Sequence, residues 1–524
     1  MGTVYHTPMA SHSGSRYRCI VSGKVWLVGA GPGDPGLITV RGWEVLGQAD
    51  VVLYDALSHP GLLAACPEAE LRDVGKRYGK PNPPQEWITD QLVELARAGR
   101  RVVRLKGGDP FLFARGAEEA LALHDAGIPF EIVPGISSPV AASAYAGFSL
   151  THRGRSSSVT FITGSDRDAH GWSPEAWHRL ATATDTICVL MGMRRIAQIT
   201  RALVDGGRAP ATPAAVVQWG ARPEQVVVEG TLGTIAERVR ERGVTNPAIL
   251  FVGDVTELRG SLRWYDNRPL FGKRIIVPRP AHQATETALA IRARAAEPLV
   301  HPVVEVQAPP EPERLAAVVR DLGAYDWVIF TSANGVERAF AEIERQGLDA
   351  RAFAAAKVAV IGPKTRASLA AYGIRADLVA KEFVAESLVR DLLDRGAPRR
   401  ALLLRALEAR EVLPEALRGA GCEIDVVPAY ETRAIGAEAL TALRALLERG
   451  GADVVLLTSG AIANSFLDAL GPEPAALLEN ITVSSIGPIT SDAIRQRGVT
   501  VDVEAESYTV DGLLDALERH FSRR

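Results

Sequence analysis

The segment that most constrains this 524-residue chain is 25-VWLVGAGPGDPGLIT-39, in which a short apolar run ends in Gly29, Gly31 and Gly33. Three glycines in five residues let the backbone pass very close to a bound molecule, at a turn between a strand and a helix. The spacing is close to that of a dinucleotide fingerprint, but Asp34 stands where the fingerprint requires Gly or Ala. Because a carboxylate there would repel a pyrophosphate, the segment indicates a ligand that is not a dinucleotide.

Length and charge limit the class of protein. The chain is too long for one hydrophobic core, so we expect three or four domains. A net charge of −3 argues neither for nucleic acid nor for a membrane surface as partner, and we expect neither. Local arginines, lysines and backbone amides would have to meet any anionic ligand. No apolar run approaches the ~18 residues of a membrane span. Residues 1–22 are polar and lack an apolar signal core, which predicts a flexible tail.

The cysteines indicate the compartment. The four of them are scattered and form no CxxC pair, which favours a reducing environment without disulfides or a metal site. We therefore expect a cytoplasmic protein. These cysteines are Cys19, Cys66, Cys188 and Cys422.

The first half alternates strand-like and helix-like stretches. Its strand candidates are mostly continuous runs of β-branched residues and leucine, which is typical of buried sheets in an α/β protein. A Pro- and Gly-marked turn at 134–139 divides this half, and a polar, turn-rich stretch predicts a linker at 261–270. The strand candidates are 25–29, 51–54, 101–105, 129–133, 159–163, 186–190, 214–218 and 248–252.

The second half contains an internal repeat, in which a T-S motif and an I-G-P-x-T motif occur twice in the same order. Two similar units in the same order predict two similar α/β lobes. The opening strand 274-RIIVPRP-280 matches neither repeated segment. We therefore expect the chain to begin in one lobe, build the other, and return through two linking strands near Pro302 and Tyr430. The matching segments are 326–340 with 453–467, and 358–374 with 483–499.

Polar and glycine residues follow several strands of the first half. Asp55 follows one strand, Lys76 lies in 74-VGKR-77 at another strand exit, and the run 107-GGDP-110 follows a third. Taken alone, GGDP is as well explained by a β-turn, and Asp55 by a helix cap. In open α/β sheets, however, ligands bind beyond the carboxyl ends of the strands, so we expect the set to converge on one cleft.

Taken in order, these segments resemble a known family. GAGPGD, VVLYD, GK, VVRLKGGDPF, VPGISS, AYAGFSLTHR and MG resemble the tetrapyrrole methylases, in particular uroporphyrinogen-III C-methyltransferase, over residues 24–258. The resemblance implies two α/β domains with S-adenosylmethionine in the cleft between them. It implies transfer of two methyl groups to uroporphyrinogen III, giving precorrin-2 on the route to sirohaem and cobalamin, and a homodimer through this half.

The resemblance also implies residue roles. Asp55 is the expected proton acceptor and Lys76 the proton donor, with Asp34 and Arg153 on the substrate side. A carboxylate near an electron-rich pyrrole can take its proton, and an arginine can bind the carboxylates of the substrate. Alone, Met191 would be a core residue and Arg153 a surface residue. The expected cofactor contacts are Pro32, Gly107, Gly108, Asp109, Leu112, Ser137, Ser138, Met191 and Gly220.

The second half resembles uroporphyrinogen-III synthase over residues 271–516, through TSANGV, IGPKT, AESL, PAYETR, LLTSG and SIGPIT. The family has two α/β lobes and closes hydroxymethylbilane into uroporphyrinogen III while inverting one ring. Tyr430 is then the expected weak acid, although packing explains a tyrosine at a lobe crossing equally well. Ser332 and Ser459 are also plausible helix N-caps. The expected carboxylate-binding residues are Arg279, Thr331, Ser332, Gly362, Thr365, Thr458, Ser459, Gly487 and Thr490.

Three alternatives stay open. The first half would methylate a later precorrin or a different compound, or would be a nicotinamide-dependent oxidoreductase, although Asp34 argues against the latter. The second half would be a non-catalytic module that binds a carboxylated tetrapyrrole. The domain prediction is a two-domain α/β methylase at 23–260, divided near 135, followed by a two-lobed α/β fold at 271–524. The lobes are expected at 271–301 with 431–520, and at 302–430.

Overall fold

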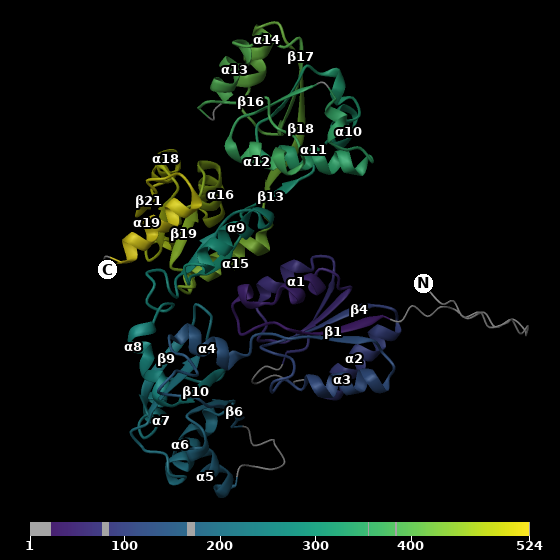
Figure 1. Cartoon of the computed structure of the whole chain (residues 1–524). Helices are drawn as coiled ribbons and strands as arrows, with labels where there is room; N and C mark the ends of the chain where they lie inside the picture. The colour runs from purple at the N-terminus through teal and green to yellow at the C-terminus, as the bar shows by residue number, and fades with distance from the viewer. Residues whose placement is uncertain (1–22, 76–82, 165–172, 355, 383–384, 523–524) are drawn as a thin grey trace, which may run out of the picture. The chain divides into compact units, whose positions relative to one another are not determined.

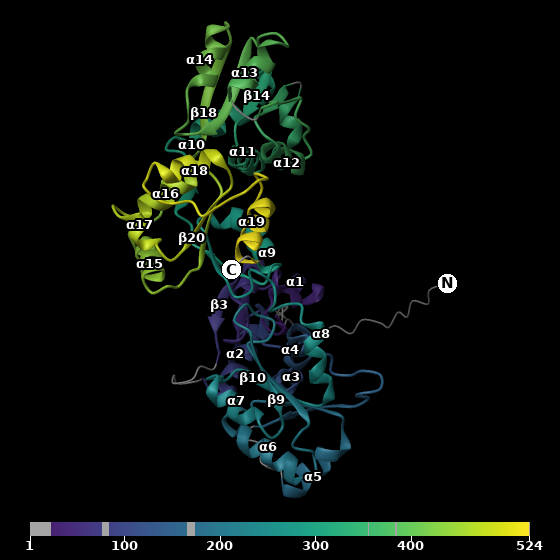
Figure 2. The same ribbon diagram turned by 90° about the vertical axis from the view of Figure 1, so that its left-hand side faces the viewer.

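The computed structural model describes residues 23–75, 83–164, 173–354, 356–382 and 385–522. The chain divides into two compact units, Met1–Gly272 and Lys273–Arg524. Each unit is built on two β-sheets covered by helices (Figure 1 and, turned by 90°, Figure 2). Each unit is described by itself below.

The first sheet of unit 1 is parallel throughout, in the order β3-β2-β4-β1-β5. Helix α1 (Val40–Leu46) packs on one face, while α2 (Gln85–Arg97) and α3 (Gly116–Asp125) pack on the other. Because all the strands run the same way, their carboxyl ends meet at one edge. The strands are β1 (Lys24–Gly29), β2 (Val51–Tyr54), β3 (Glu70–Asp73), β4 (Arg101–Lys106) and β5 (Phe130–Val133).

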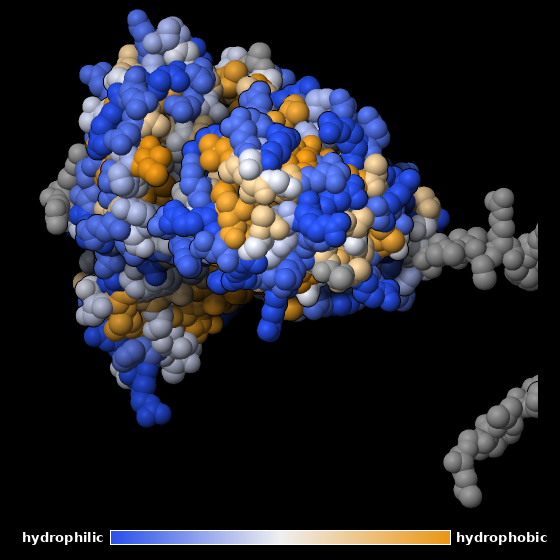
Figure 3. All heavy atoms as spheres, turned by 90° about the horizontal axis from the view of Figure 1, so that it is seen from above, coloured by the Kyte–Doolittle hydropathy of each residue, from blue (hydrophilic) through white to orange (hydrophobic). Residues whose placement is uncertain are grey.

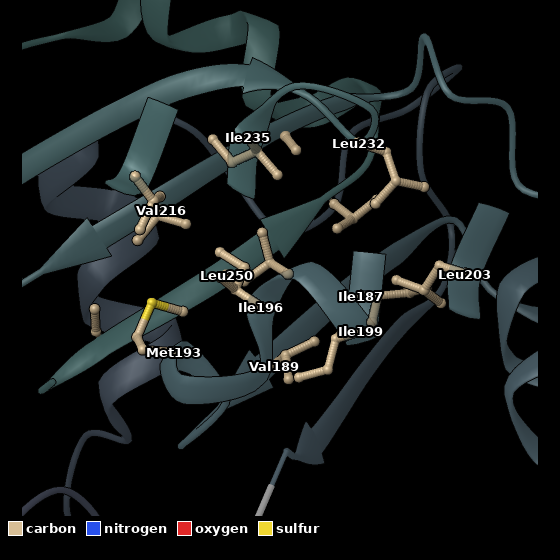
Figure 4. Packing of buried hydrophobic residues seen from close by; sticks show 14 of the residues in the cluster. Ile187, Val189, Met193, Ile196, Ile199, Leu203, Val216, Leu232, Ile235 and Leu250 are labelled. Atoms are coloured by element: carbon tan, nitrogen blue, oxygen red, sulfur yellow. The ribbon is translucent and has the colours of Figure 1, made fainter. Parts of the chain in front are cut away.

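The second sheet of unit 1 has the order β6-β7-β10-β8-β9, and only β6 and β7 pair in parallel. Helices α5 (Pro174–Ala183), α6 (Ile196–Asp205) and α7 (Ile235–Glu241) bury aliphatic side chains against one face. Figure 4 shows those of α6 and α7 packed against the strands. Helix α4 (Ser138–Ala146) packs on the other. The strands are β6 (Val159–Thr163), β7 (Thr186–Leu190), β8 (Pro213–Gln218), β9 (Val226–Thr231) and β10 (Ala248–Val252).

The eight strand predictions for this half are confirmed, with ends shifted by at most one residue. The sequence analysis missed β3 and β9, which are edge strands. β3 is mostly exposed and carries charged residues, so it lacks the apolar run that marks a central strand. The segment expected as a linker, 261–270, packs on unit 1: α8 (Arg259–Leu262) overlaps its start, and Tyr265 and Leu270 are buried.

Unit 2 contains two sheets that follow the predicted repeat. The helices and strands β14-α11-β15-α12 in one lobe recur as β19-α16-β20-α18 in the other. These are β14 (Trp327–Phe330), α11 (Ala333–Arg345), β15 (Lys357–Val360) and α12 (Pro363–Ala371) in the first set. The second set is β19 (Val454–Leu457), α16 (Gly460–Leu470), β20 (Thr482–Ser485) and α18 (Pro488–Arg495).

The chain enters one lobe, builds the other and returns, as the unmatched opening strand predicts. β11 (Arg274–Val277) belongs to the parallel sheet β12-β11-β19-β20-β21, whereas β13 (Val304–Gln307) pairs antiparallel with the long β18 (Glu423–Ala434) in the sheet β13-β18-β17-β14-β15-β16. The remaining strands are β12 (Glu297–Val300), β16 (Leu378–Val379), β17 (Arg400–Ala406) and β21 (Val503–Glu504).

Helices cover both sheets of unit 2, and they include α9 (Ala281–Arg292), α10 (Pro312–Val319), α13 (Ala385–Leu393), α14 (Val412–Gly419), α15 (Ala437–Glu448), α17 (Pro474–Leu477) and α19 (Val510–Ser522). Within the described residues, no helix is both long and apolar enough to cross a membrane. On the face that Figure 3 displays, hydrophilic side chains surround smaller apolar groups.

Candidate active site

Loops from both sheets of unit 1 line a cavity of about 320 Å³. Six of the nine predicted cofactor contacts line it, from the exits of β1, β4, β7 and β8 and the start of α4. The expected convergence is therefore seen only in part: Gly107 of the GGDP run lines this cavity, whereas Asp55 does not. The six residues are Pro32, Gly107, Leu112, Ser138, Met191 and Gly220.

Glycine backbones form the base of this site. Gly31 and Gly108 exchange two backbone hydrogen bonds, of 2.8 and 3.2 Å, and both adopt positive φ, of 74° and 72°. Gly29 lies so close to Gly135 that a Cβ at Gly29 would be 2.5 Å from its backbone. A side chain at Gly29 would force its loop and the Gly135 loop apart, whereas one at Gly31 or Gly108 would be strained by the positive φ. The glycines of the opening motif thus serve packing between loops as well as access to a ligand.

Asp109 ties two of these loops together. Its Oδ1 accepts from the Phe111 amide at 2.8 Å, and its Oδ2 accepts from the Gly135 amide at 3.0 Å. Asp109, together with Gly108 and Ser137, does not line the cavity itself. The structure therefore gives these three predicted contacts a place directly behind the wall, where Asp109 fixes the loop that carries Gly107.

Several lining residues escaped the sequence analysis. Trp219 and Arg222, after β8, are the most prominent: the Arg222 guanidinium lies 5.0 Å from the centre of the Trp219 ring, and its Nη2 donates to the Leu57 carbonyl at 2.6 Å. The position of the 219–222 loop at a strand exit was the available signal. The other missed residues are Leu57, Phe113, Ala114, Ala142, Leu190, Val217, Asn246, Pro247, Ala248 and Ile249.

Met191 is held in an unusual backbone conformation. It follows β7 with φ of 55°, and its apolar side chain is 49% exposed at the cavity wall. A non-glycine residue in this region is strained, and such strain persists only where the surrounding structure fixes it. An exposed methionine in a strained loop is not the core residue that its type alone suggests.

Asp55 belongs to a mostly buried charge network. Arg104 Nη2 donates to Asp55 Oδ1 at 2.5 Å, and Arg104 Nε lies 3.3 Å from Glu119 Oε1. Lys106 Nζ contacts both oxygens of Glu119, at 2.9 and 3.0 Å. Burial, and then the charge of Arg104, lowers the pKa of Lys106. Two cations thus share one fully buried carboxylate, and Asp55 supplies the second negative charge.

Asp55 lines a smaller cavity of about 180 Å³ rather than the wall of the larger one. Ser58 and His59 line it too, and the buried Ser58 hydroxyl has no hydrogen-bond partner among the described residues. Leu57, two residues after Asp55, lines the larger cavity. The carboxylate therefore lines a separate, smaller cavity, two residues before the residue that lines the larger one.

The other predicted residues of this half are dispersed. Asp34 accepts from the Gly36 amide through Oδ1 and from the Tyr145 hydroxyl through Oδ2, each at 2.8 Å. Arg153 is exposed, and its side chain has no ion pair or hydrogen bond in the described part of the chain. Lys76 lies outside the described residues.

In unit 2 the predicted serine N-caps are confirmed. Ser332 Oγ accepts from the Gly335 amide and Ser459 Oγ from the Ile462 amide, each at 3.2 Å. Tyr430, 7% exposed in the core of its lobe, places its hydroxyl 3.0 Å from Ser332 Oγ. Tyr430 therefore packs in the core and also contacts the T-S loop, so both of its interpretations have a structural basis.

The two I-G-P-x-T segments differ from expectation in one respect. Gly362 and Gly487 cap the starts of α12 and α18, but Thr365 and Thr490 are 5% and 4% exposed. Both residues belong to the first turns of these helices and are buried, so a ligand outside the protein would not reach them. Thr331 and Thr458 are half-buried at the ends of β14 and β19.

Arg279 follows β11 and is desolvated. Burial lowers its pKa, and the pKa of Lys364 on α12 is lowered by burial and then by the charge of Arg279. Neither side chain has a hydrogen bond or ion pair among the residues that the structure describes. Nearby, Gln283 on α9 donates to Asn334 on α11 at 2.5 Å, so the two lobes touch beside these cations.

A further cavity of unit 2, of about 450 Å³, lies along β13, β18 and α16. Its walls include Val304, Thr432, Ser465 and Asp468, and none of the predicted substrate residues is among them. Within the described residues, no group of three or more His, Cys, Asp or Glu side chains is placed to hold a metal ion.

Comparison with known proteins covers both units. Residues 24–236 match the tetrapyrrole (corrin/porphyrin) methylases, and residues 285–515 match uroporphyrinogen-III synthase HemD. The porphyrin biosynthesis protein HemD of Ruminiclostridium josui is 36% identical over 497 residues, which cover 94% of this chain and 97% of that protein.

Further relatives match unit 1. A uroporphyrinogen-III C-methyltransferase of Sinorhizobium sp is 49% identical over 245 residues, covering 46% of this chain and 87% of that protein. The crystal structure of uroporphyrin-III C-methyltransferase from Thermus thermophilus with S-adenosyl homocysteine is 38% identical, covering 45% of this chain and all of that one, with a TM-score of 0.40. The chain thus belongs to the tetrapyrrole methylase family through its first unit and to the uroporphyrinogen-III synthase family through its second.

Proposed function

We propose that unit 1 binds S-adenosylmethionine and transfers two methyl groups to uroporphyrinogen III, giving precorrin-2 of the sirohaem and cobalamin branch. The observation that supports this most is the 320 Å³ cavity, where glycine loops and the exposed Met191 meet beside Asp55. The C-methyltransferase relatives support the choice of reaction.

The cavity suits an adenosyl and methionyl ligand. Gly107 presents bare backbone at the wall, where a Cβ would meet only Leu57, at 3.2 Å. Leu190, Met191, Val217 and Ile249 give apolar surface for a flat ring system. When bound, S-adenosylmethionine supplies a methyl group on a sulfonium, and in-line positioning is the main contribution a protein makes to such a transfer.

The chain's own residues supply the acid–base chemistry. Asp55 is the acceptor for the proton that a methylated pyrrole ring must lose, and Arg104 orients that carboxylate through a charge-assisted hydrogen bond. Arg153, exposed and without a counter-ion among the described residues, would bind carboxylates of the tetrapyrrole. Lys76 keeps its expected role as proton donor, and Asp34 its place on the substrate side.

We propose that unit 2 closes hydroxymethylbilane to uroporphyrinogen III. The helix starts at Ser332, Gly362, Ser459 and Gly487 offer backbone amides to carboxylates, and Arg279 with Lys364 adds positive charge. Tyr430 stands by one of these starts as a weak acid for loss of the hydroxyl. The HemD relative, which spans both units, supports the pairing of activities.

The two proposed activities are consecutive, because the product of unit 2 is the substrate of unit 1. We also expect a homodimer through unit 1 and a cytoplasmic location. The decisive experiment gives the full chain hydroxymethylbilane and methyl-labelled S-adenosylmethionine, and follows label by chromatography. Labelled precorrin-2 is the expected product. Unlabelled uroporphyrinogen III alone would overturn the proposal for unit 1, and an unchanged ratio of isomers against a no-enzyme control would overturn it for unit 2.

A further inference from the structure

Tyr145 connects α4 to Asp34. Its hydroxyl donates to Asp34 Oδ2 at 2.8 Å, while the Gly36 amide donates to the other carboxylate oxygen at the same distance. Burial, and then this bond, raises the pKa of Tyr145, which keeps the hydroxyl protonated and able to donate. The orientation of the Asp34 carboxylate is therefore set from both sides, by its own loop and by α4.

The segment 259–266 covers the end of α4. The last carbonyls of a helix have no partner within it, and this segment supplies two. Trp264 Nε1 donates to the Ala144 carbonyl at 2.8 Å, and the Arg259 guanidinium donates to the Ala146 carbonyl. Gly147, with φ of 85°, ends the helix where a Cβ would lie 2.7 Å from the Arg263 Cα. α8 lies beside α4 in both ribbon views (Figures 1 and 2).

The same segment confines the Tyr145 ring. The rings of Trp264 and Tyr265 pack edge-on against it, with centroids at 5.1 and 4.7 Å. Such pairs add to the energy of burial and restrict the ring to one orientation. Tyr265 is itself 5% exposed and packs on Phe271 at 5.5 Å. The aromatic cluster thus runs from Asp34 to the last residues of unit 1.

Tyr145 is also tied to the cavity. Gln225, which is 4% exposed, donates to the Tyr145 carbonyl at 3.1 Å and accepts from the Ala221 amide at 3.1 Å. Ala221 ends the strained loop whose Trp219 and Gly220 line the cavity. At its other end α4 contributes Ser138 to the same wall. The backbone of Tyr145 is therefore tied to the cavity, whereas its hydroxyl contacts Asp34.

From these contacts we propose that Tyr145 is a positioning residue for methyl transfer, which orients Asp34 toward the tetrapyrrole and is itself held by Trp264 and Tyr265. The inference rests on the methyltransferase activity proposed for unit 1. On this proposal, segment 259–266 helps to position a residue of the methyl-transfer site and does not merely connect the two units.

The test is Tyr145→Phe in the full chain, which removes one hydroxyl and keeps the ring. The loss of a hydrogen bond to a charged group changes an equilibrium constant by about tenfold or more. We expect the KM for uroporphyrinogen III to rise by about that factor, with the affinity for S-adenosylhomocysteine within about twofold of wild type. A merely structural role would lower the thermal midpoint or weaken both ligands together, and that result would overturn the proposal.

The matched control is Tyr325→Phe. The Tyr325 hydroxyl makes an equivalent bond, of 2.7 Å to Asp425, but in unit 2. It should leave the kinetics of methyl transfer unchanged.

A double-mutant cycle isolates the contact. In an Asp34→Ala background, Tyr145→Phe should change the KM for uroporphyrinogen III by less than about twofold, because the carboxylate that accepts from the hydroxyl is already absent. Trp264→Phe, which removes the indole donor to α4, should raise the same KM. If the effects of Tyr145→Phe and Asp34→Ala on this KM simply multiply in the double variant, the inference is contradicted. If wild-type chain itself transfers no methyl group, the proposed function fails instead, so the two failures are distinguishable.

Discussion

Arg104 fixes Asp55 from the neighbouring strand, with its Nη2 atom 2.5 Å from the carboxylate Oδ1. Arg104 is almost fully buried on β4, whereas the Asp55 side chain is 29% exposed at the exit of β2. A buried guanidinium thus holds a carboxylate that still reaches space outside the core. Arg104 therefore fixes the orientation of the carboxylate, while part of the Asp55 side chain stays accessible to a ligand.

The first prediction concerns the proposed role of Asp55 as the base. Asp55→Asn keeps the shape and a hydrogen-bond acceptor for Arg104 but removes the basic oxygen. General base catalysis contributes about 100-fold or more, so methyl transfer should slow by at least that factor. Single-turnover assays would measure the rate, and calorimetry should find the S-adenosylhomocysteine affinity unchanged. Asp50→Asn is the control: Asp50 also pairs with an arginine, Arg101 at 2.7 Å, but precedes β2 at the opposite edge of the sheet. A rate equal to that of the control would remove Asp55 from the mechanism.

A second prediction concerns the stability of unit 1. Glu119→Gln leaves the cations of Arg104 and Lys106 in the core with half of their negative charge removed. Breaking a buried ion pair costs about 3 kcal/mol or more, so urea should unfold unit 1 at a clearly lower concentration. Glu118→Gln next to it breaks an exposed pair with Arg115 and should cost less than about 1 kcal/mol. If both substitutions lower the free energy of unfolding by similar amounts, the buried network contributes no more to stability than the exposed pair.

The sequence predicts the strands of unit 1 well because a central strand of a buried sheet must be apolar along its whole length. The same physics explains the omission of β3, an exposed edge strand. Six of the contacts that the family resemblance implies share a cavity, and most of them follow strand ends. Roles inside that region are harder to predict. Asp109 and Thr365 carry the motif residue types, yet Asp109 bonds two loops and Thr365 is buried.

What the sequence does not reveal are contacts between distant loops. Trp219 and Leu57 meet at one wall because Arg222 bridges their loops, 165 residues apart in the chain. Tyr145 and Asp34 are joined in the same way, across 111 residues. Neither pair has a local pattern, since each depends on how two sheets pack. The final turn-rich stretch of unit 1 illustrates the point, because polar composition suggests a linker where buried aromatic contacts form.

A third prediction tests the cavity wall. Gly220 lies so close to α4 that a Cβ would be 2.6 Å from the Ala142 Cβ, and both residues line the cavity. Gly220→Ala must therefore move the loop or the helix, at a cost typical of overpacking. The dissociation constant of S-adenosylhomocysteine should rise about tenfold or more in calorimetry. Gly47→Ala, whose new methyl would meet only ordinary contacts from 3.5 Å outward, should leave it unchanged. Equal affinities in all three proteins would place the cofactor elsewhere.

The fourth prediction concerns unit 2. Tyr430→Phe preserves packing in the lobe but removes the hydroxyl that lies 3.0 Å from Ser332 Oγ. If that hydroxyl acts as an acid, formation of uroporphyrinogen III from hydroxymethylbilane should slow by about 100-fold, while the thermal midpoint changes little. Chromatography of the oxidised products measures both the rate and the fraction of uninverted isomer. Tyr325→Phe again serves as control. Undiminished cyclisation would leave Tyr430 with its packing role alone.

The last prediction concerns acid pH. Hydrogen bonds from Arg41 and then Lys24 lower the pKa of Glu131 from 4.5 to about 2. A carboxylate whose pKa falls on folding stabilises the folded protein at any pH above its unfolded-state pKa. This contribution disappears as the pH falls from about 4.5 toward 2. Glu131→Gln should therefore speed hydrogen exchange of the β1 amides at pH 6 and much less at pH 3. Comparing variant with wild type at each pH cancels the intrinsic exchange rate. Glu241→Gln, which breaks no ion pair or hydrogen bond found in the described residues, should show no such trend. A variant-to-wild-type ratio independent of pH would mean that the cluster around Glu131 acts through packing and not through charge.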